Sequence, residues 1–435
     1  MRDLSVLIVG AGPVGLLTTL RLAQADIRVK CVEALAAIDA SPRAMAYHPI
    51  AVKELDRAGV LDDCRRIGSA GTGLCWRSTR TKEVIAEIDR APSKEFPYEN
   101  LTIGQHLLAD IVLEHLKGCK NAEVLFNTKV TAVDQSSGDD VVLTVEDSDG
   151  QSRQLTATYC VAADGGRSTM RRLLDISFDG FTYEEQLVST NVYFDFAAHG
   201  WKDGNFMVDP DHWALMGRIN NEGLWRVSYG EKPGLTDDEL KERMPMKYAA
   251  MFPGEGKVNG EQRWELQQMS PYRLNQRCAS TFKKGQVMLA GDAAHLCNLF
   301  GGLGLTGGIM DAAALADSLI VIYESKTSET VLEKYAEVRR QIFVDTVNPT
   351  SQANKTRLHD SDPDTIGDPD PFLHMLRQAS ADEKQVVRSN AVLAVDMTEF
   401  FDQVKSDAGQ STSGAEVADQ QGIIQGNGLE TATVH

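Results

Sequence analysis

The chain has 435 residues, of which 42 % are hydrophobic and 24 % are charged, and its formal net charge is -18 at pH 7. This length exceeds what one compact core normally supports and predicts two domains, with or without a helical appendage. The acidic balance argues against nucleic acid or an anionic membrane surface as a partner, because both carry negative charge.

The cysteines and the N-terminal residues indicate which kinds of site and which cell compartment to expect. The seven cysteines include no C-x-x-C pair and no Cys/His spacing typical of zinc. We therefore expect no metal site, no disulfide framework and a reducing, cytoplasmic location. The missing cysteine pair also argues against a flavoprotein disulfide reductase. Asp3 and the G-A-G-P interruption disfavour a signal peptide, and no run reaches the roughly 18–20 apolar residues that a membrane span needs.

Strand and helix patterns alternate in the first part of the chain. Residues 4–9 form a short apolar run typical of a buried parallel strand, residues 13–25 have leucines at helical spacing, and residues 27–32 form a second apolar run. Together they predict a βαβ unit. Residues 74–90 then predict a hairpin-like excursion, and residues 103–118 predict an amphipathic helix.

The pattern changes in the middle of the chain and then returns. Residues 122–164 predict further strands, and residues 186–270 predict an antiparallel sheet of short strands. A strand–turn–helix pattern reappears at 285–325, so the first domain is interrupted and then completed. The predicted boundaries are 1–73, 101–185 and 276–345 for the discontinuous first domain, 74–100 and 186–275 for the sheet domain, 346–405 for a C-terminal helical segment, and 406–435 for a polar tail.

A glycine motif follows the first predicted strand. Gly10, Gly12 and Gly15 have the G-x-G-x-x-G spacing, and Pro13 stands at the helix start. Such glycines permit a tight turn, the approach of a pyrophosphate and close helix–strand packing. Glu33 ends the second strand, where a carboxylate can bind a ribose hydroxyl. The motif predicts dinucleotide binding without separating FAD from NAD.

Two further motifs follow in order, A-D-G-G-R-S at 163–168 and A-G-D-A-A-H at 290–295, the latter continued by G-G-L-G-L-T-G-G at 301–308. With the first motif, this trio resembles the class A, single-component FAD-dependent monooxygenases, the aromatic hydroxylases akin to p-hydroxybenzoate hydroxylase and phenol hydroxylase. The resemblance covers about residues 3–345. It implies an α/β fold with a Rossmann-like FAD-binding domain of the glutathione-reductase type and an antiparallel substrate domain.

The resemblance also implies which residues hold FAD. They are Gly10, Gly12, Pro13, Gly15, Glu33, Arg43, Gln105, Asp164, Gly165, Asp292, Gly304, Leu305 and Thr306. Asp164 would contact both FAD and NAD(P)H, and Asp292 would bind the ribityl chain. A helix beginning near Thr306 would direct its amides at the flavin pyrimidine ring and stabilise negative charge there.

The sequence departs from the family at two positions near the last motif. Leu299 stands where the family usually has proline, and Thr306 stands where it usually has asparagine. We expect the loop before the helix to be less stiff than a proline-containing loop. The chain is also too short for the thioredoxin-like tail of the phenol hydroxylase branch.

The implied reaction uses NAD(P)H as a transient co-substrate, because no second glycine fingerprint precedes another βαβ unit. O2 would then add at the flavin C4a, and the resulting hydroperoxide would hydroxylate a small aromatic or phenolic substrate beside the 186–270 sheet. We select Arg226, which resembles a family arginine near the flavin, with a sheet-edge salt bridge as its alternative. The candidate bases are His48, Tyr47 and Tyr229. His295 is interpreted as structural.

The sequence leaves several functions open. The same scaffold supports epoxidation or oxidative decarboxylation, whereas halogenation is disfavoured because the W-x-W-x-I-P motif is missing. A non-catalytic flavin-binding redox protein also stays open, as does an NAD-dependent dehydrogenase, although the second and third motifs disfavour the latter. Glu33 informs only the FAD site, so NADH and NADPH both remain candidates. Residues 346–435 are interpreted as a helical lid or as a contact in a homodimer.

Overall fold

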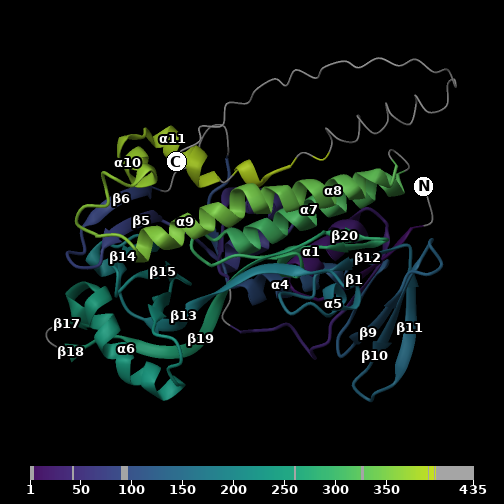
Figure 1. The fold of residues 1–435 in the computed structure, drawn as a ribbon, viewed down its shortest axis with the longest axis horizontal. Coiled ribbons are helices and arrows are strands. Elements are labelled where there is room, and N and C mark those ends of the chain that lie inside the picture. The colour runs from purple at the N-terminus through teal and green to yellow at the C-terminus, as the bar shows by residue number, and fades with distance from the viewer. Residues whose placement is uncertain are drawn as a thin grey trace, which may run out of the picture.

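The computed structural model describes residues 4–41, 44–89, 97–258, 261–324, 328–389, 391–395 and 397. It contains a mainly parallel sheet and a mainly antiparallel sheet, and long helices run along one side of the molecule (Figure 1). The predicted α/β fold class, with a helical C-terminal region, is confirmed.

The six-stranded sheet has the order β20-β21-β12-β1-β2-β8. Its strands are β1 (Ser5–Val9), β2 (Arg28–Val32), β8 (Ala122–Leu125), β12 (Tyr159–Ala162), β20 (Lys283–Lys284) and β21 (Val287–Leu289). Strand β1 pairs in parallel with β2 and β12. Residues 6–9 of β1 are apolar and buried, as is typical of a strand inside a parallel sheet, and α1 and β11 contact this strand. The helix α1 (Pro13–Gln24) connects β1 to β2 and completes the predicted βαβ unit.

The helix α7 (Leu303–Tyr323) is a central element of the core. It is long and apolar enough to cross a membrane by length and composition, but 78 % of its most apolar stretch is buried inside the structure. It packs against α1, α2 (Pro49–Arg57) and α8 (Thr330–Ile342). These contacts explain its composition, since a helix that is apolar all round is buried.

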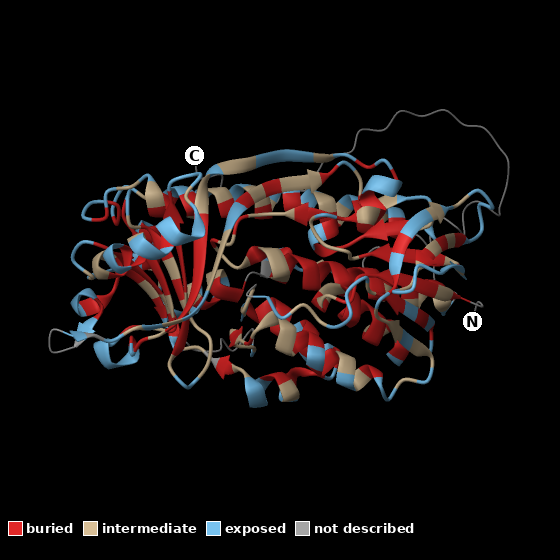
Figure 2. Cartoon of the chain, turned by 90° about the horizontal axis from the view of Figure 1, so that it is seen from below, coloured by how far each residue is buried: buried red, intermediate tan, exposed pale blue. Residues whose placement is uncertain are grey.

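Smaller elements surround this sheet. They are α3 (Leu61–Ile67), α4 (Gln105–Leu116), α5 (Thr169–Leu173), the three-stranded sheet of β9 (Lys129–Asp134), β10 (Val141–Glu146) and β11 (Ser152–Ala157), and the small sheet of β3 (Ala46–Tyr47), β7 (Leu101–Thr102) and β4 (Ser69–Ala70). Buried apolar residues of these elements, apart from β4, form one core with the six-stranded sheet, and buried residues are red in Figure 2.

The second large sheet has the order β22-β19-β13-β16-β15-β14-β5-β6. Its strands are β5 (Gly73–Ser78), β6 (Val84–Asp89), β13 (Phe178–Tyr193), β14 (Gly204–Val208), β15 (Ala214–Arg218), β16 (Leu224–Glu231), β19 (Glu265–Ala279) and β22 (His295–Leu296). The antiparallel sheet predicted for 186–270 is present, but its strands are not all short. Strands β13 and β19 have 16 and 15 residues, and they pair along most of their length.

The helix α6 (Asp237–Met251) lies within the region that was predicted to contain only strands. A capping box starts it: the Thr236 hydroxyl accepts from the Glu239 amide, and the Glu239 carboxylate accepts from the Thr236 amide. This T-x-x-E signal stands in the sequence and identifies the helix start. Its buried face packs on one side of the eight-stranded sheet.

Helices dominate the C-terminal region. A π-helix (Phe343–Val347) joins α8 to α9 (Asn348–His359), and α10 (Pro371–Gln378) and α11 (Ala381–Ser389) follow and contact β6. The predicted tail at 406–435 lies outside the described residues. The division into domains at the boundaries given above stays a prediction, and β13 and β19 run through two of those boundaries without a break.

Candidate active site

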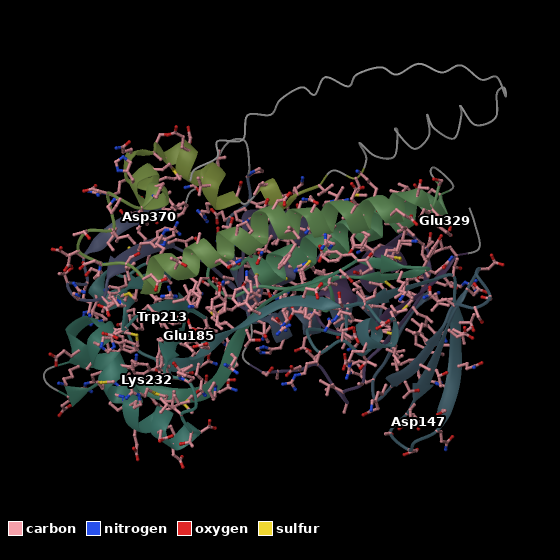
Figure 3. All side chains as sticks on the ribbon, viewed as in Figure 1. Asp147, Glu185, Trp213, Lys232, Glu329 and Asp370 are labelled. Atoms are coloured by element: carbon pink, nitrogen blue, oxygen red, sulfur yellow. The ribbon has the colours of Figure 1, made fainter. Side chains whose placement is uncertain are left out.

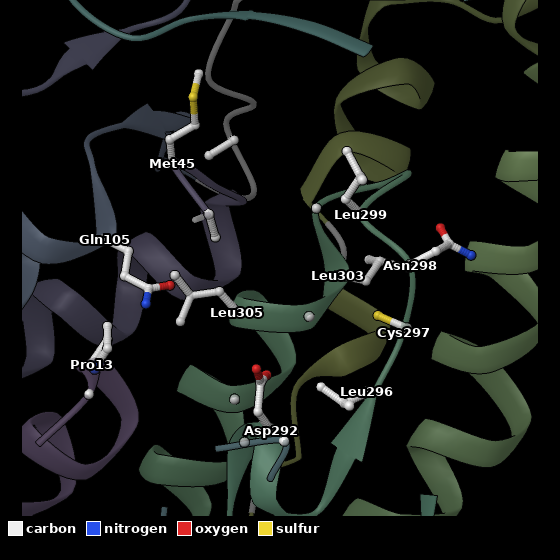
Figure 4. Close-up of a pocket in the computed structure, with 18 of the residues that line it drawn as sticks. Pro13, Met45, Gln105, Asp292, Leu296, Cys297, Asn298, Leu299, Leu303 and Leu305 are labelled. Carbon is white, nitrogen blue, oxygen red and sulfur yellow. The ribbon is translucent and has the colours of Figure 1, made fainter. Parts of the chain in front are cut away.

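One cavity of about 1800 Å³ is lined by residues of both large sheets and of the C-terminal helices. This volume exceeds the roughly 300–1,000 Å³ of a pocket for one drug-sized ligand. It therefore has room for a dinucleotide together with a second small molecule. Figure 4 shows one part of it, where Pro13, Gln105, Asp292 and Leu305 lie around a common space.

The glycine turn after β1 forms one wall of the cavity. Gly10 has φ +106°, and a Cβ there would lie 2.4 Å from the Ala163 carbonyl oxygen. A Cβ on Gly15 would lie 2.0 Å from the Gly10 oxygen, so both positions require glycine. A Cβ on Gly12 would meet nothing within 4 Å, because Gly12 faces the cavity at the start of α1. This end of the helix can receive a phosphate.

Glu33 is fixed beside that turn. Its Oε2 accepts from the Ala11 amide at 2.8 Å, and its Oε1 accepts from the Leu35 amide at 2.9 Å. The side chain therefore presents negative charge to the cavity at the end of β2. An open helix start beside a fixed carboxylate fits the pyrophosphate and ribose of FAD.

The A-D-G motif lies on the same wall, but its aspartate has local partners. The Asp164 carboxylate accepts from the Ser168 hydroxyl at 2.6 Å and from the Thr169 and Met170 amides at 2.7 and 3.0 Å. These bonds fix the start of α5. Gly165 has φ +77° and faces the cavity. Direct contacts of Asp164 with FAD and NAD(P)H stay a prediction.

The helix after the third motif starts earlier than predicted. Helix α7 begins at Leu303, after Gly302 with φ +65°, and not near Thr306. Gly304 and Leu305 in its first turn line the cavity. Thr306 is fully buried and its hydroxyl donates to the Gly302 carbonyl at 2.9 Å, so it faces the helix rather than the cavity.

Asp292 and Gln105 also line the cavity, from the short turn after β21 and from the start of α4. The structure thus brings together most of the residues expected to hold FAD. The exceptions are Gly15 and Thr306, which act through packing, and Arg43, which lies outside the described residues.

The two candidates on β16 point to opposite faces of the sheet. Arg226 lines the cavity, and its Nε donates to Asn191 Oδ1 at 2.8 Å. Because β16 lies between β13 and β15, Arg226 is not at a sheet edge, and that part of the alternative is wrong. Tyr229 stands three positions later and therefore faces α6, where its ring lies 6.1 Å from that of Tyr248. This position disfavours Tyr229 as a residue that acts on the substrate.

His48 lines the cavity, but its ring nitrogens are not directed into it. Its Nε2 lies 2.6 Å from the Gly301 carbonyl oxygen, and its Nδ1 is buried. Burial lowers the pKa of His48, although carbonyl groups nearby oppose this effect. Tyr47 is fully buried in the core of the six-stranded sheet. This geometry disfavours both residues as a base acting directly on the substrate.

An aromatic wall closes the part of the cavity beside the eight-stranded sheet. The rings of Trp76 and Phe206 stack with centroids 4.9 Å apart, and Phe372 of α10 meets Trp76 edge-on at 5.3 Å. Met216 touches the edge of the cavity, but its side chain and that of Met207 both belong to the apolar cluster on the α6 side of the sheet. Trp76 and Phe372 belong to no motif, so no local sequence signal identifies them.

The last histidine of the third motif has a structural environment. His295 Nε2 lies 2.7 Å from Asp311 Oδ2, and Arg339 Nε donates to Asp311 Oδ1 at 2.7 Å. Burial alone would raise the pKa of Asp311, but His295 and Arg339 together lower it. The group is fully buried and fixes α7 to α8. Within the described ranges, no cluster of three or more His, Cys, Asp or Glu side chains is arranged to hold a metal ion.

Comparison with known proteins identifies the family. The FAD binding domain family matches residues 3–350 of the chain. The chain belongs to this family. In this FAD-binding protein, the glycine turn, Glu33 and the start of α7 are therefore the parts of the cavity that fit the cofactor. The resemblance to class A flavoprotein monooxygenases is confirmed.

Two curated relatives of this FAD-binding protein are named as monooxygenases. It is 40 % identical over 362 residues to para-nitrophenol 4-monooxygenase of Pseudomonas sp. (strain WBC-3), which covers 82 % of this chain and 88 % of that protein. It is 36 % identical over 361 residues to 6-hydroxy-3-succinoylpyridine 3-monooxygenase HspB of Pseudomonas putida (strain DSM 28022 / S16), which covers 82 % and 90 %.

A solved structure extends the match to the C-terminal helices. The p-nitrophenol 4-monooxygenase PnpA from Pseudomonas putida DLL-E4 superposes with a TM-score of 0.78 at 36 % sequence identity. The match covers 93 % of this chain and 97 % of that chain. The helices after residue 350 therefore belong to the shared architecture, although they lie beyond the family's FAD binding domain.

Proposed function

We propose that this protein is an FAD-dependent monooxygenase that uses NAD(P)H and O2 to hydroxylate a small phenolic substrate. The observation that carries the proposal is the single cavity in which the glycine turn, the start of α7 and the aromatic wall meet. A dinucleotide along the first two features would bring its flavin end toward the third. The compounds in the names of both curated relatives have an aromatic ring that bears a hydroxyl group, and this supports a phenol-like ligand.

Different residues of the cavity wall would bind different parts of FAD. The amides at the start of α1 would bind the pyrophosphate, and Glu33 would accept hydrogen bonds from the ribose. The amides of Gly304 and Leu305 would face the flavin and stabilise its negative charge. Bound FAD would supply the redox chemistry that reduces O2.

The substrate would lie against the aromatic wall. Trp76 and Phe206 offer stacked ring surfaces for an aromatic ligand and exclude water from it. Arg226 brings positive charge to the same sheet face, where it could hold a phenolate or another anionic group. NAD(P)H would visit the cavity and leave, because the resemblance implies no dedicated nicotinamide domain.

The test is the oxidation of NADH and NADPH by FAD-loaded protein, with and without a panel of phenols and aromatic acids, while H2O2 is measured in parallel. We expect one class of phenol to accelerate the oxidation with little H2O2. Rapid oxidation without any ligand, with all of the oxidised NAD(P)H recovered as H2O2, would contradict the proposal. A decarboxylated or epoxidised product would instead support the alternative chemistries on the same scaffold.

A further inference from the structure

The loop at residues 297–302, between β22 and α7, forms part of the cavity wall. Cys297, Leu299, Gly301 and Gly302 all line the cavity, and Gly302 leads directly into the first turn of α7. The loop contains no proline. Its conformation must therefore be fixed by contacts rather than by a restricted backbone dihedral.

Asn298 makes those contacts; it is part of the cavity wall, but in Figure 4 its side chain points away from the space around Gln105 and Asp292. The residue is 1 % exposed. Its backbone amide donates to Gln276 Oε1 at 3.0 Å, and its Nδ2 donates to the Ser351 carbonyl at 2.9 Å. Its Oδ1 accepts from the Phe300 amide at 3.0 Å. The side chain thus bonds both to the loop itself and to helix α9.

Gln276 of β19 completes the connection between sheet and helix. It is 2 % exposed, and its Nε2 donates to Ser351 Oγ at 2.7 Å and to Asn348 Oδ1 at 2.9 Å. Asn354, one turn further along α9, donates through Nδ2 to the Phe300 carbonyl at 3.2 Å. Asn348, Ser351 and Asn354 are spaced three residues apart, so they lie along one side of the helix.

Further contacts hold the 297–302 loop and helix α9 in place. The Gly301 carbonyl lies 2.6 Å from His48 Nε2, and because a carbonyl oxygen only accepts, the ring nitrogen donates. Helix α9 itself is tied to the eight-stranded sheet by Lys355, which forms an ion pair with Glu185 and lies over the ring of Trp213 at 5.3 Å. Figure 3 labels Glu185 and Trp213 at this junction.

We propose that Gln276, Asn298, Ser351 and Asn354 form an amide clamp that fixes the 297–302 loop and thereby positions the start of α7 against the flavin. The clamp restricts by hydrogen bonding a loop that the family commonly restricts with a proline. It gives α9 a role as a positioning element for the active site. This inference rests on the proposed function for its catalytic consequence, but not for its effect on the loop.

The chemistry of the clamp favours this role. Its members are neutral, and nearly all are buried, so each broken bond leaves an unpaired polar group inside the protein. Such a network specifies one arrangement strongly when it is fully satisfied. None of its four side chains titrates near neutral pH, so pH should act on the loop only through His48, which is bonded to the Gly301 carbonyl.

The test compares hydrogen exchange of the 297–302 amides in the FAD-supplemented full-length protein and in three variants. Asn298→Ala should accelerate exchange of that loop by about tenfold or more, and Asn354→Ala should do so to a smaller extent. Thr356→Ala is the matched control, because this residue lies on α9 with an exposed side chain. The control should exchange like the wild type.

Two further measurements connect the loop to the flavin. Asn298→Ala and Asn354→Ala should weaken FAD binding by about tenfold or less, and they should raise the H2O2 formed per NAD(P)H oxidised, while Thr356→Ala changes neither. Loop exchange that is unchanged in both clamp variants, or accelerated equally in the control, would overturn the clamp. Failure of the wild type to oxidise NAD(P)H would reject the proposed function alone, since the exchange result still decides the clamp. If Asn298→Ala does not fold, the comparison of Asn354→Ala with the control decides.

Discussion

At the scale of single residues, the glycine turn separates positions that serve the fold from positions that serve the ligand. Gly15 touches the backbone of its own turn, whereas Gly12 faces open cavity. The same motif therefore carries two physical requirements, close packing at one glycine and ligand approach at the other. The sequence predicts both glycines equally well, but only the structure assigns each requirement to its position.

This difference predicts two distinct outcomes for the same substitution. Gly12→Ala should leave the melting temperature of the FAD-free protein unchanged and should weaken FAD binding by about tenfold or more, because its methyl group would enter the phosphate site. Gly15→Ala should lower the melting temperature of the FAD-free protein itself, because its methyl group would overlap the Gly10 carbonyl. Thermal unfolding without FAD and flavin titration measure the two effects. Equal behaviour of the two variants would show that the assignment is wrong.

His48 predicts a pH dependence of stability. Burial lowers the pKa of His48 below its ordinary value of about 6.5. As the pH falls through that value, the unfolded chain therefore binds more protons than the folded protein does. The stability contributed by the neutral ring is present above this pH and is lost below it. His212, whose pKa burial also lowers, acts with the same sign.

We therefore expect His48→Gln, which retains a donor for Gly301, to reduce the fall in melting temperature between about pH 7 and pH 5. Replacement of the exposed His374 by Gln serves as the control and should leave the fall unchanged. A fall that is just as steep in His48→Gln would show that the buried ring does not contribute to it.

At the scale of elements, local signals predicted the helices and strands around the motifs, and non-local pairing determined the rest. The βαβ unit follows from apolar runs and glycines that are close in sequence. The lengths of β13 and β19 depend on each other, since they pair with each other across the intervening segment 194–264. Helix α6 was missed although its capping box is local, because the surrounding aromatic residues favoured strands.

The capping box of α6 gives the prediction at this scale. Thr236→Ala should lower the stability of the part that contains the eight-stranded sheet by about 1 kcal/mol, because the Glu239 amide loses its acceptor. Lys241→Ala, on the exposed face of the same helix, should change it little. Urea unfolding followed by tryptophan fluorescence measures the stability of both variants. An equal loss of stability in the two would show that the capping box is not the cause.

At the scale of the whole molecule, the cavity explains what the sequence could and could not predict. The FAD-facing side of the cavity was predictable because each of its motifs is a short run of residues whose backbone conformation limits which residue types can stand there. The aromatic wall was not, because Trp76 and Phe206 meet only through the parallel pairing of β5 with β14. The choice between Arg226 and Tyr229 likewise depended on which face of β16 meets the cavity and which meets α6.

We propose that this one cavity brings FAD, O2 and a phenol together for oxygen transfer. The most direct measurement is turnover under ¹⁸O2 with the phenol that best accelerates NAD(P)H oxidation, followed by mass spectrometry of the product. We expect one ¹⁸O atom in each molecule of hydroxylated product and none when the label is supplied as water. A product without the label, or ¹⁸O recovered only in H2O2, would contradict it.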